Sequence, residues 1–144
     1  MKKKLLVISL FALSGALIVL GTPTPQYEFS GEEAIKRLIR NGECRDCDLS
    51  NQDLRDAMAI VNRKYRKRCM FTDFSDANLS NANLSGTDLS CATMRGANLT
   101  GANLSNANLS NAIMTGANLT GADLTNANMS GANMAGVDMT DAIR

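Results

Sequence analysis

From Phe74 onward, an apolar residue recurs at every fifth position without a slip. The series consists of Phe74, Leu79, Leu84, Leu89, Met94, Leu99, Leu104, Leu109, Met114, Leu119, Leu124, Met129, Met134 and Met139. A small residue, usually Ala, stands two positions before each of them, and Asn or Asp usually lies between. Neither the helical period of about 3.6 residues nor the strand period of about 2 produces this repeat. The pattern therefore predicts a stacked solenoid.

A square coil accommodates the five-residue period. If each unit forms one side, four units close a turn of 20 residues, with the small and the large apolar residues pointing inward. Asn or Asp, Ser or Thr, and the Gly or Asn that follows then line the outer surface and the corners. Successive coils pair their backbones at about 4.8 Å, as strands do. The fourteen units predict three and a half coils.

Motifs such as Ala-Asn-Leu-Ser-Asn and Ala-Asn-Leu-Thr-Gly resemble the pentapeptide-repeat family over residues 70–144. The resemblance implies an all-β solenoid, the right-handed quadrilateral β-helix. It implies little about activity, because most members resemble each other only as scaffolds. A few members inhibit topoisomerases by resembling DNA. We do not expect that role here, because residues 70–144 carry six acidic and two basic groups and the chain has features of an exported protein.

The N-terminus has the features of a secretory signal. Lys2, Lys3 and Lys4 precede an apolar run of 16 residues, and Gly21 follows the run. This arrangement predicts a signal peptide at 1–21, because a spanning helix needs about 20 apolar residues. We expect export to a periplasm, a thylakoid lumen or the extracellular space. An uncleaved helix that anchors the protein to a membrane is the alternative.

A capping helix is predicted before the repeats. Ser30 and Glu33 have the spacing of a capping box, and Gly42 follows as a stop signal. We expect a helix over 31–40 that covers the first coil, because solenoid ends need caps. Residues 22–44 then form a linker and this cap, and the repeat rod spans 45–144.

The rod is expected to be interrupted at 55–69. Between Leu54 and Phe74 the five-residue phase is kept, but a coil here would point Lys64 and Lys67 inward. Burying unpaired ammonium groups is too costly, so this segment should loop out. Apolar residues at helical spacing predict a short amphipathic helix against the rod, namely Leu54, Met58, Val61 and Tyr65.

Five basic residues follow within six positions: Arg63, Lys64, Arg66, Lys67 and Arg68. One interpretation is a solvated loop that balances the acidic rod. The other is a docking patch for anionic lipid headgroups or an acidic partner. Nucleic acid is not expected as a partner of an exported chain.

Four cysteines in an exported chain favour oxidation over metal storage. Cys44 and Cys47, followed by Asp-Leu, resemble the entry sequence of many exported pentapeptide-repeat proteins of photosynthetic bacteria. We interpret them as a local disulfide that pins the cap to the first coil. A catalytic dithiol and a pair of reduced buried thiols are the alternatives. Spacing does not decide whether Cys69 pairs with Cys91.

Stacking by 20 residues places the departures from the repeat on one side of the rod. Thr93 and Ile113 replace Asn or Asp, Arg95 replaces Ser or Thr, and Phe71 and Cys91 lie at the corner. These residues are a candidate interaction face, although drift under weak constraint explains them equally well. The inward column of the same side is expected to be core filler rather than a soft-metal ladder: Phe74, Met94, Met114 and Met134.

The chain has no His, which removes the usual general base and the usual neutral metal ligand. We therefore expect a non-enzymatic exported scaffold or protein-interaction module, without cofactor or metal. The alternatives are thiol–disulfide exchange through Cys44 and Cys47, and a surface-active protein that coats ice or the cell envelope. The last coil has no predicted lid, which suggests a homodimer or a partner docked through this end.

Overall fold

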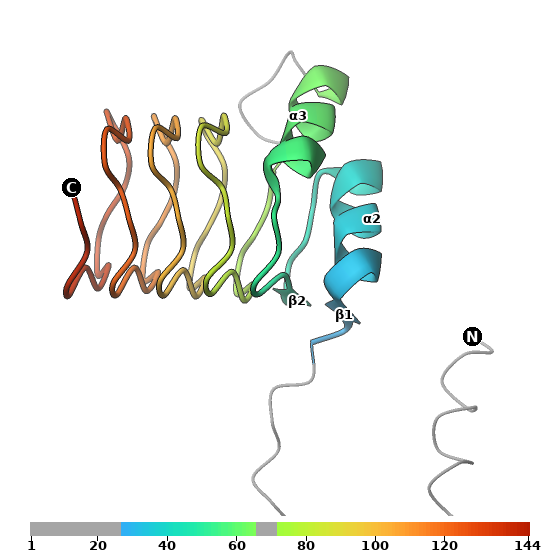
Figure 1. Cartoon of the computed structure of the whole chain (residues 1–144), viewed down its shortest axis with the longest axis horizontal. Helices are drawn as coiled ribbons and strands as arrows, with labels where there is room; N and C mark the ends of the chain where they lie inside the picture. Colours follow the sequence, from blue (N-terminus) through green and yellow to red (C-terminus); the bar gives the residue numbers. More distant parts are fainter. Residues whose placement is uncertain (1–26, 66–71) are drawn as a thin grey trace, which may run out of the picture.

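The computed structural model describes residues 27–65 and 72–144 of the 144-residue chain. The expected signal at 1–21 lies outside this part. The regular elements are β1 (Phe29–Ser30), α2 (Gly31–Asn41), β2 (Cys47–Asp48) and α3 (Arg55–Lys64). Figure 1 shows both helices at one end of a rod of stacked coils, with the C-terminus at the opposite end.

Parallel bridges between residues 20 positions apart hold the coils together. Asp73 pairs with Thr93, Thr93 with Ile113, and Ile113 with Asn133, and the residues five positions further along form the next such column. Four columns of this kind give the coil four sides. Backbone hydrogen bonds between coils run along each side, for example from the Leu99 N–H to the Asn118 oxygen at 2.7 Å. The predicted five-residue side and 20-residue turn are confirmed.

We number the four sides by the outward residues that pair between coils. Side 1 carries Glu43, Asp73, Thr93, Ile113 and Asn133, and side 2 carries Asp48, Asn78, Asn98, Asn118 and Asp138. Side 3 carries Asp53, Asn83, Asn103, Asp123 and Ile143, and side 4 carries Asp88, Asn108 and Asn128.

The inside of the rod is filled by the two inward residues of each unit. The Leu, Met and Phe residues from Phe74 to Leu124 are almost entirely buried, as are the Ala residues between them. Thr87 is a buried polar residue at a small inward position, and its hydroxyl donates to the Leu84 carbonyl oxygen at 2.7 Å. Core packing along the rod explains the period, because the inward residues of successive coils form one continuous buried cluster.

The corners explain the Gly and Asn that end each unit. These residues have positive φ, for example 58° at Asn106 and 65° at Gly101, a conformation that Gly and Asn tolerate best. Gly101 has a second constraint, because a Cβ atom there would overlap the side-chain oxygen of Asn81 in the preceding coil. Cys91 adopts the same conformation with φ of 59°.

The first coil differs from the others because α3 stands where its fourth side would be. Its bridges join residues 30 positions apart, as between Asp48 and Asn78. The predicted amphipathic helix is confirmed: Met58 and Val61 are buried against the rod. The Asn62 side-chain amide donates to the Asp88 carbonyl oxygen at 2.9 Å. That oxygen belongs to side 4 of the next coil. Among the described residues, the first coil provides no bridge partner for Asp88, so α3 supplies a hydrogen-bond donor there.

The N-terminal cap is α2, which buries Ala34 and Leu38 over the first coil. Gly42 ends it in the left-handed conformation, as predicted. The predicted capping box is wrong, since the Ser30 side chain makes no capping hydrogen bond. Ser30 belongs instead to β1, whose two residues pair with β2, and the Glu33 carboxylate accepts from Lys36 at 3.3 Å.

The C-terminal end of the rod is more open. Its inward residues Met129, Met134 and Met139 are only partly buried, whereas their counterparts in earlier coils are almost fully buried. Within the described residues, the backbone N–H groups of these three Met residues have no acceptor. The homodimer through this end stays a prediction.

Candidate interaction surfaces

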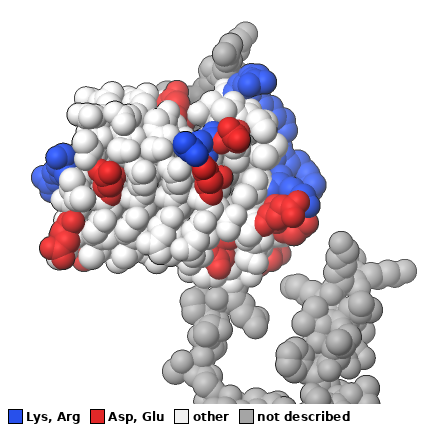
Figure 2. Space-filling model, in the orientation of Figure 1, with Lys and Arg blue, Asp and Glu red and all other residues white. Residues whose placement is uncertain are grey.

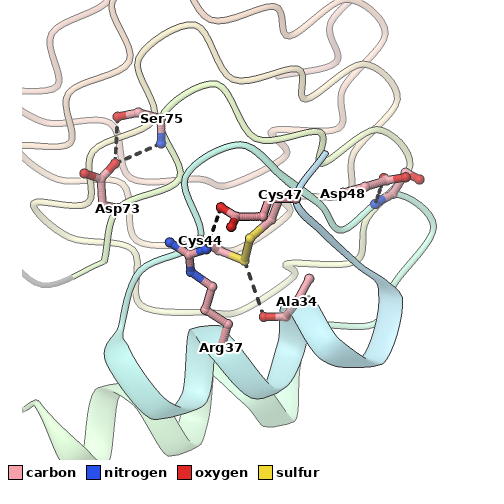
Figure 3. The surroundings of a disulfide bond; sticks show 9 residues. Ala34, Arg37, Cys44, Cys47, Asp48, Asp73 and Ser75 are labelled. Atoms are coloured by element: carbon pink, nitrogen blue, oxygen red, sulfur yellow. Dashed lines mark hydrogen bonds and ion pairs between the residues drawn. A yellow bond between two sulfur atoms is a disulfide. The ribbon is translucent and has the colours of Figure 1, made fainter. Parts of the chain in front are cut away.

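The Cys44–Cys47 pair forms the predicted disulfide, with 5.3 Å between the two Cα atoms. Both residues are completely buried beneath α2. Figure 3 shows the Cys44 sulfur pointing at the Ala34 carbonyl oxygen of α2, 3.3 Å away. This is a packing contact, because a disulfide sulfur carries no hydrogen to donate. The bond therefore ties the chain directly beneath the cap, at the entry to the rod.

Cys91 takes part in a disulfide bond. Cys69, the partner considered from the sequence, lies outside the described residues, so their pairing is not described. Cys91 occupies a corner position, as expected.

The basic docking patch is only partly described, because Arg66, Lys67 and Arg68 lie outside the described residues. Lys64 is used within the molecule: its ammonium group donates to the Arg40 carbonyl oxygen at 2.7 Å and approaches that of Ile39 at 3.4 Å. The Tyr65 hydroxyl donates to the same Arg40 oxygen at 2.6 Å. Lys64 therefore caps the C-terminus of α2, where a positive charge is favourable.

Arg63 is exposed. Figure 2 shows basic residues gathered over the helical end of the rod, while the visible wall is mostly uncharged with scattered charged residues of both signs. Of the two described residues of the patch, Lys64 therefore has a structural role at the end of α2, and Arg63 is directed to solvent.

The outer wall has a regular hydrogen bond that the sequence analysis did not predict. At fourteen outward Asp or Asn residues, the side-chain Oδ1 accepts the backbone N–H of the residue two positions later. On side 2, for example, the Thr100 N–H lies 3.1 Å from Asn98 Oδ1 and the Thr120 N–H 2.9 Å from Asn118 Oδ1. This is an Asx turn, and the Asn/Asp-x-Ser/Thr spacing was the signal that could have predicted it.

Two neighbouring units on side 1 lack this bond. Thr93 and Ile113 stand where the acceptor should be, and within the described residues the N–H groups of Arg95 and Thr115 have no hydrogen-bond acceptor. The backbone beneath them is unchanged, because Met94 and Met114 donate to the next coil at 2.7 Å and 3.0 Å. The substitutions therefore alter the outer surface of side 1 and leave its ladder intact.

The structure brings three predicted face residues together. Thr93 and Ile113 are bridge partners, and Arg95 lies two positions after Thr93 with an exposed side chain. Among residues 27–65 and 72–144, the Arg95 guanidinium has no ion-pair partner. Cys91 lies at the preceding corner, and Phe71 is outside the described residues. Arg45, two coils earlier on this side, differs because it pairs with Asp73 at 2.7 Å.

The carboxylates of the wall show what the turn donors do. The N–H and the hydroxyl of Thr140 donate to Asp138 and lower the pKa of its carboxyl. The hydroxyl and the N–H of Thr125 lower the pKa of Asp123. Hydrogen bonds from Arg55 lower the pKa of Asp53 to about 2. At Asp138 and Asp123 the N–H and hydroxyl donors of the turn therefore favour the ionised carboxylate, whereas at Asp53 the Arg55 side chain contributes most.

Within the described residues, no three His, Cys, Asp or Glu side chains are grouped to hold a metal ion. Neither α2 nor α3 is long and apolar enough to cross a membrane. The apolar run at 5–20 lies outside the part to which this finding applies.

Comparison with known proteins identifies the repeat. The family model described as pentapeptide repeats matches eight copies over residues 68–106 and 102–141. The crystal structure of the pentapeptide-repeat protein Rfr23 from the cyanobacterium Cyanothece 51142 is similar, with 30% identity, a TM-score of 0.51, and coverage of 76% of this chain and 96% of that one.

A second similar structure is that of a pentapeptide-repeat protein from Nostoc Pcc 7120. It has 31% identity, a TM-score of 0.37, and coverage of 79% of each chain. No curated protein matches this chain significantly.

Proposed function

The chain belongs to the pentapeptide-repeat family, whose fold is the right-handed quadrilateral β-helix, and on that premise we propose that it is an exported, non-enzymatic scaffold. Members of this family are generally non-enzymatic. In this proposal the rod binds a partner protein through the outer surface of side 1.

One observation carries the proposal: between residues 73 and 140, the wall loses its Asx turn on one side only. Sides 2, 3 and 4 repeat the same Asx turn from coil to coil, and side 1 gives it up at Thr93 and Ile113. The two changes lie in successive coils and are bridge partners, so they form one continuous patch rather than scattered surface variation. Losing two wall hydrogen bonds costs stability, which favours another use for the patch.

Export is proposed from the basic and apolar N-terminus together with the disulfide. A bond between Cys44 and Cys47 is expected in an oxidising compartment such as a periplasm, a thylakoid lumen or the extracellular space. A membrane anchor that keeps the N-terminal segment is the alternative.

Thiol–disulfide exchange has less support as a function. The attacking thiolate of a substrate must reach a sulfur atom, and both sulfur-bearing residues are completely buried under α2. We therefore assign the disulfide a structural role.

A second candidate function is docking of the helical end to an anionic membrane surface. The gathering of basic residues there favours it, with Arg63 exposed on α3. In this case Arg63→Ser should weaken binding to vesicles that contain phosphatidylglycerol. Lys64→Ser is not a suitable probe, because it also removes the cap of α2.

The primary test is partner capture from the native host with a C-terminally tagged full chain. The variant T93N/R95S/I113N restores the regular wall on side 1 and should lose the partner by at least tenfold. The matched control N98T/N118I makes the reverse exchange on side 2 and should retain it. Equal capture by all three proteins would contradict a role for side 1.

A further inference from the structure

The backbone N–H groups of Arg95 and Thr115, which have no acceptor in the described residues, have a defined geometry on side 1. In the regular units this N–H points outward, toward the side chain of the residue two positions before it. Because Thr93 and Ile113 are bridge partners in successive coils, the N–H groups of Arg95 and Thr115 lie about 4.8 Å apart along the rod. The wall therefore presents two aligned donors that face solvent.

The same donors bind carboxylates elsewhere in this molecule. On sides 2 and 3 the corresponding N–H groups donate to the carboxylates of Asp138 and Asp123, at 3.0 Å and 2.9 Å. A carboxylate at this point of the wall is therefore a geometry that the rod already uses. At Arg95 and Thr115, side 1 has the same donors, but Thr93 and Ile113 provide no carboxylate to accept them.

Charge strengthens the match. Arg95 itself supplies one of the two N–H groups, and its side chain is exposed without an ion-pair partner in the described residues. Hydrogen bonds to an ionised acceptor are about twice as strong as neutral ones, and guanidinium groups pair well with carboxylates.

We propose that side 1 binds a carboxylate side chain, Asp or Glu, of a partner protein through the N–H groups of Arg95 and Thr115 and the Arg95 guanidinium. The two carboxylate oxygens accept one N–H each, since each oxygen has two lone pairs. Ile113, partly exposed beside them, supplies an apolar contact for the residue next to the acidic one.

The flat surroundings favour a side chain over a chain end. The following corner is formed by Gly96 and Gly116. The Asp76 side chain of the preceding coil lies against Gly96, whereas nothing lies within 4 Å of a Cβ atom placed on Gly116. A partner segment can therefore cross the wall on the Gly116 side of the site and present a side chain there. This inference rests on the proposed function, because it names the chemistry of the same surface.

The test follows backbone amide signals of the ¹⁵N-labelled full chain by NMR. The probe is a tetraglutamate peptide with acetyl and amide ends, and a capped tetraglutamine peptide is the uncharged control. We expect saturable downfield shifts of the Arg95 and Thr115 amide protons with tetraglutamate only. The Thr100 and Thr120 amides, which hold the same place on side 2, should stay unchanged. Equal shifts at all four amides would overturn the proposal.

Two variants distinguish the contribution of the backbone N–H groups from that of the Arg95 guanidinium. T93N/I113N supplies the internal acceptors that the regular sides use, so it should remain folded and lose peptide binding at least tenfold. R95Q keeps both N–H groups and should weaken binding about fivefold. Unchanged affinity in T93N/I113N would overturn the assignment of the N–H groups.

A third peptide tests the source of the carboxylate. Tetraglutamine with a free C-terminus should bind more weakly than capped tetraglutamate, and tighter binding would overturn the choice of a side chain. If no peptide binds while T93N/R95S/I113N still loses the native partner, the carboxylate inference fails and the proposed function stands.

Discussion

Sides 1 and 2 of the rod share one backbone ladder and one kind of interior, yet their outer surfaces differ. Met94 on side 1 and Leu99 on side 2 are both completely buried, and each donates its N–H to the next coil at 2.7 Å. Outside, Asn98 completes an Asx turn that Thr93 does not. The comparison teaches that the two faces of each side are separable: the inner face sets the fold, and the outer face is free to change.

The largest expected effect lies inside, where the two sides should respond alike. Met94→Ala and Leu99→Ala each remove a fully buried side chain and should each lower the free energy of unfolding by about 2–5 kcal/mol. Urea denaturation measures both. If Met94→Ala lowered the free energy of unfolding far less than Leu99→Ala, the inner faces of sides 1 and 2 would differ as well, which would contradict this comparison.

A smaller effect should appear outside, with opposite signs on the two sides. T93N/I113N adds two turn acceptors, and a net hydrogen bond contributes about 0.5–1.5 kcal/mol, so this variant should be more stable than the parent. N98T/N118I removes two acceptors that also accept the hydroxyls of Thr100 and Thr120, so it should be less stable by at least a similar amount. The same urea experiment gives both values. Destabilisation by both variants would contradict the interpretation that side 1 lacks two stabilising turn hydrogen bonds.

The smallest effect concerns acid titration of the regular walls. The pKa of Asp53 is lowered to about 2 by hydrogen bonds from Arg55. The ionised Asp53 carboxylate therefore stabilises the folded protein, and this stabilisation is complete above the unfolded-state pKa of Asp53. The contribution is lost as the pH falls from about 4 through about 2. Carboxyl NMR titration should show this low pKa, and Arg55→Gln should raise it.

Asp138 provides the control on side 2. Its pKa is lowered mainly by the Thr140 backbone N–H, so Arg55→Gln should leave it unchanged. An unperturbed pKa at Asp138 would show that the turn N–H groups are weak anion donors.

The sequence predicted the fold in detail because the repeat has one physical cause. Every fifth residue must fill the interior, so Phe74 and the Leu and Met residues after it fixed the length of a side and of a coil. The helix at Arg55–Lys64 was also predictable, since lysines do not fit an inward position. The capping box failed because the pairing of Ser30 with Asp48 in a β-bridge is a long-range contact that local spacing does not encode.

The candidate site was predictable only in part. The sequence placed Thr93, Arg95 and Ile113 on one side, because stacking by 20 residues follows from the period. It did not indicate that Arg95 and Thr115 would lack backbone acceptors, since that required the turn hydrogen bonds of all the other units. The role of Lys64 also depended on how α2 and α3 meet, which the spacing of residues within each helix does not determine.

Amide hydrogen exchange at four positions tests the central claim most directly. If side 1 leaves its outer donors open, the Arg95 and Thr115 amides should exchange clearly faster than the Thr100 and Thr120 amides, which donate to Asn98 and Asn118. Equal protection at all four amides would contradict the account, because it would show that the N–H groups of side 1 already have acceptors.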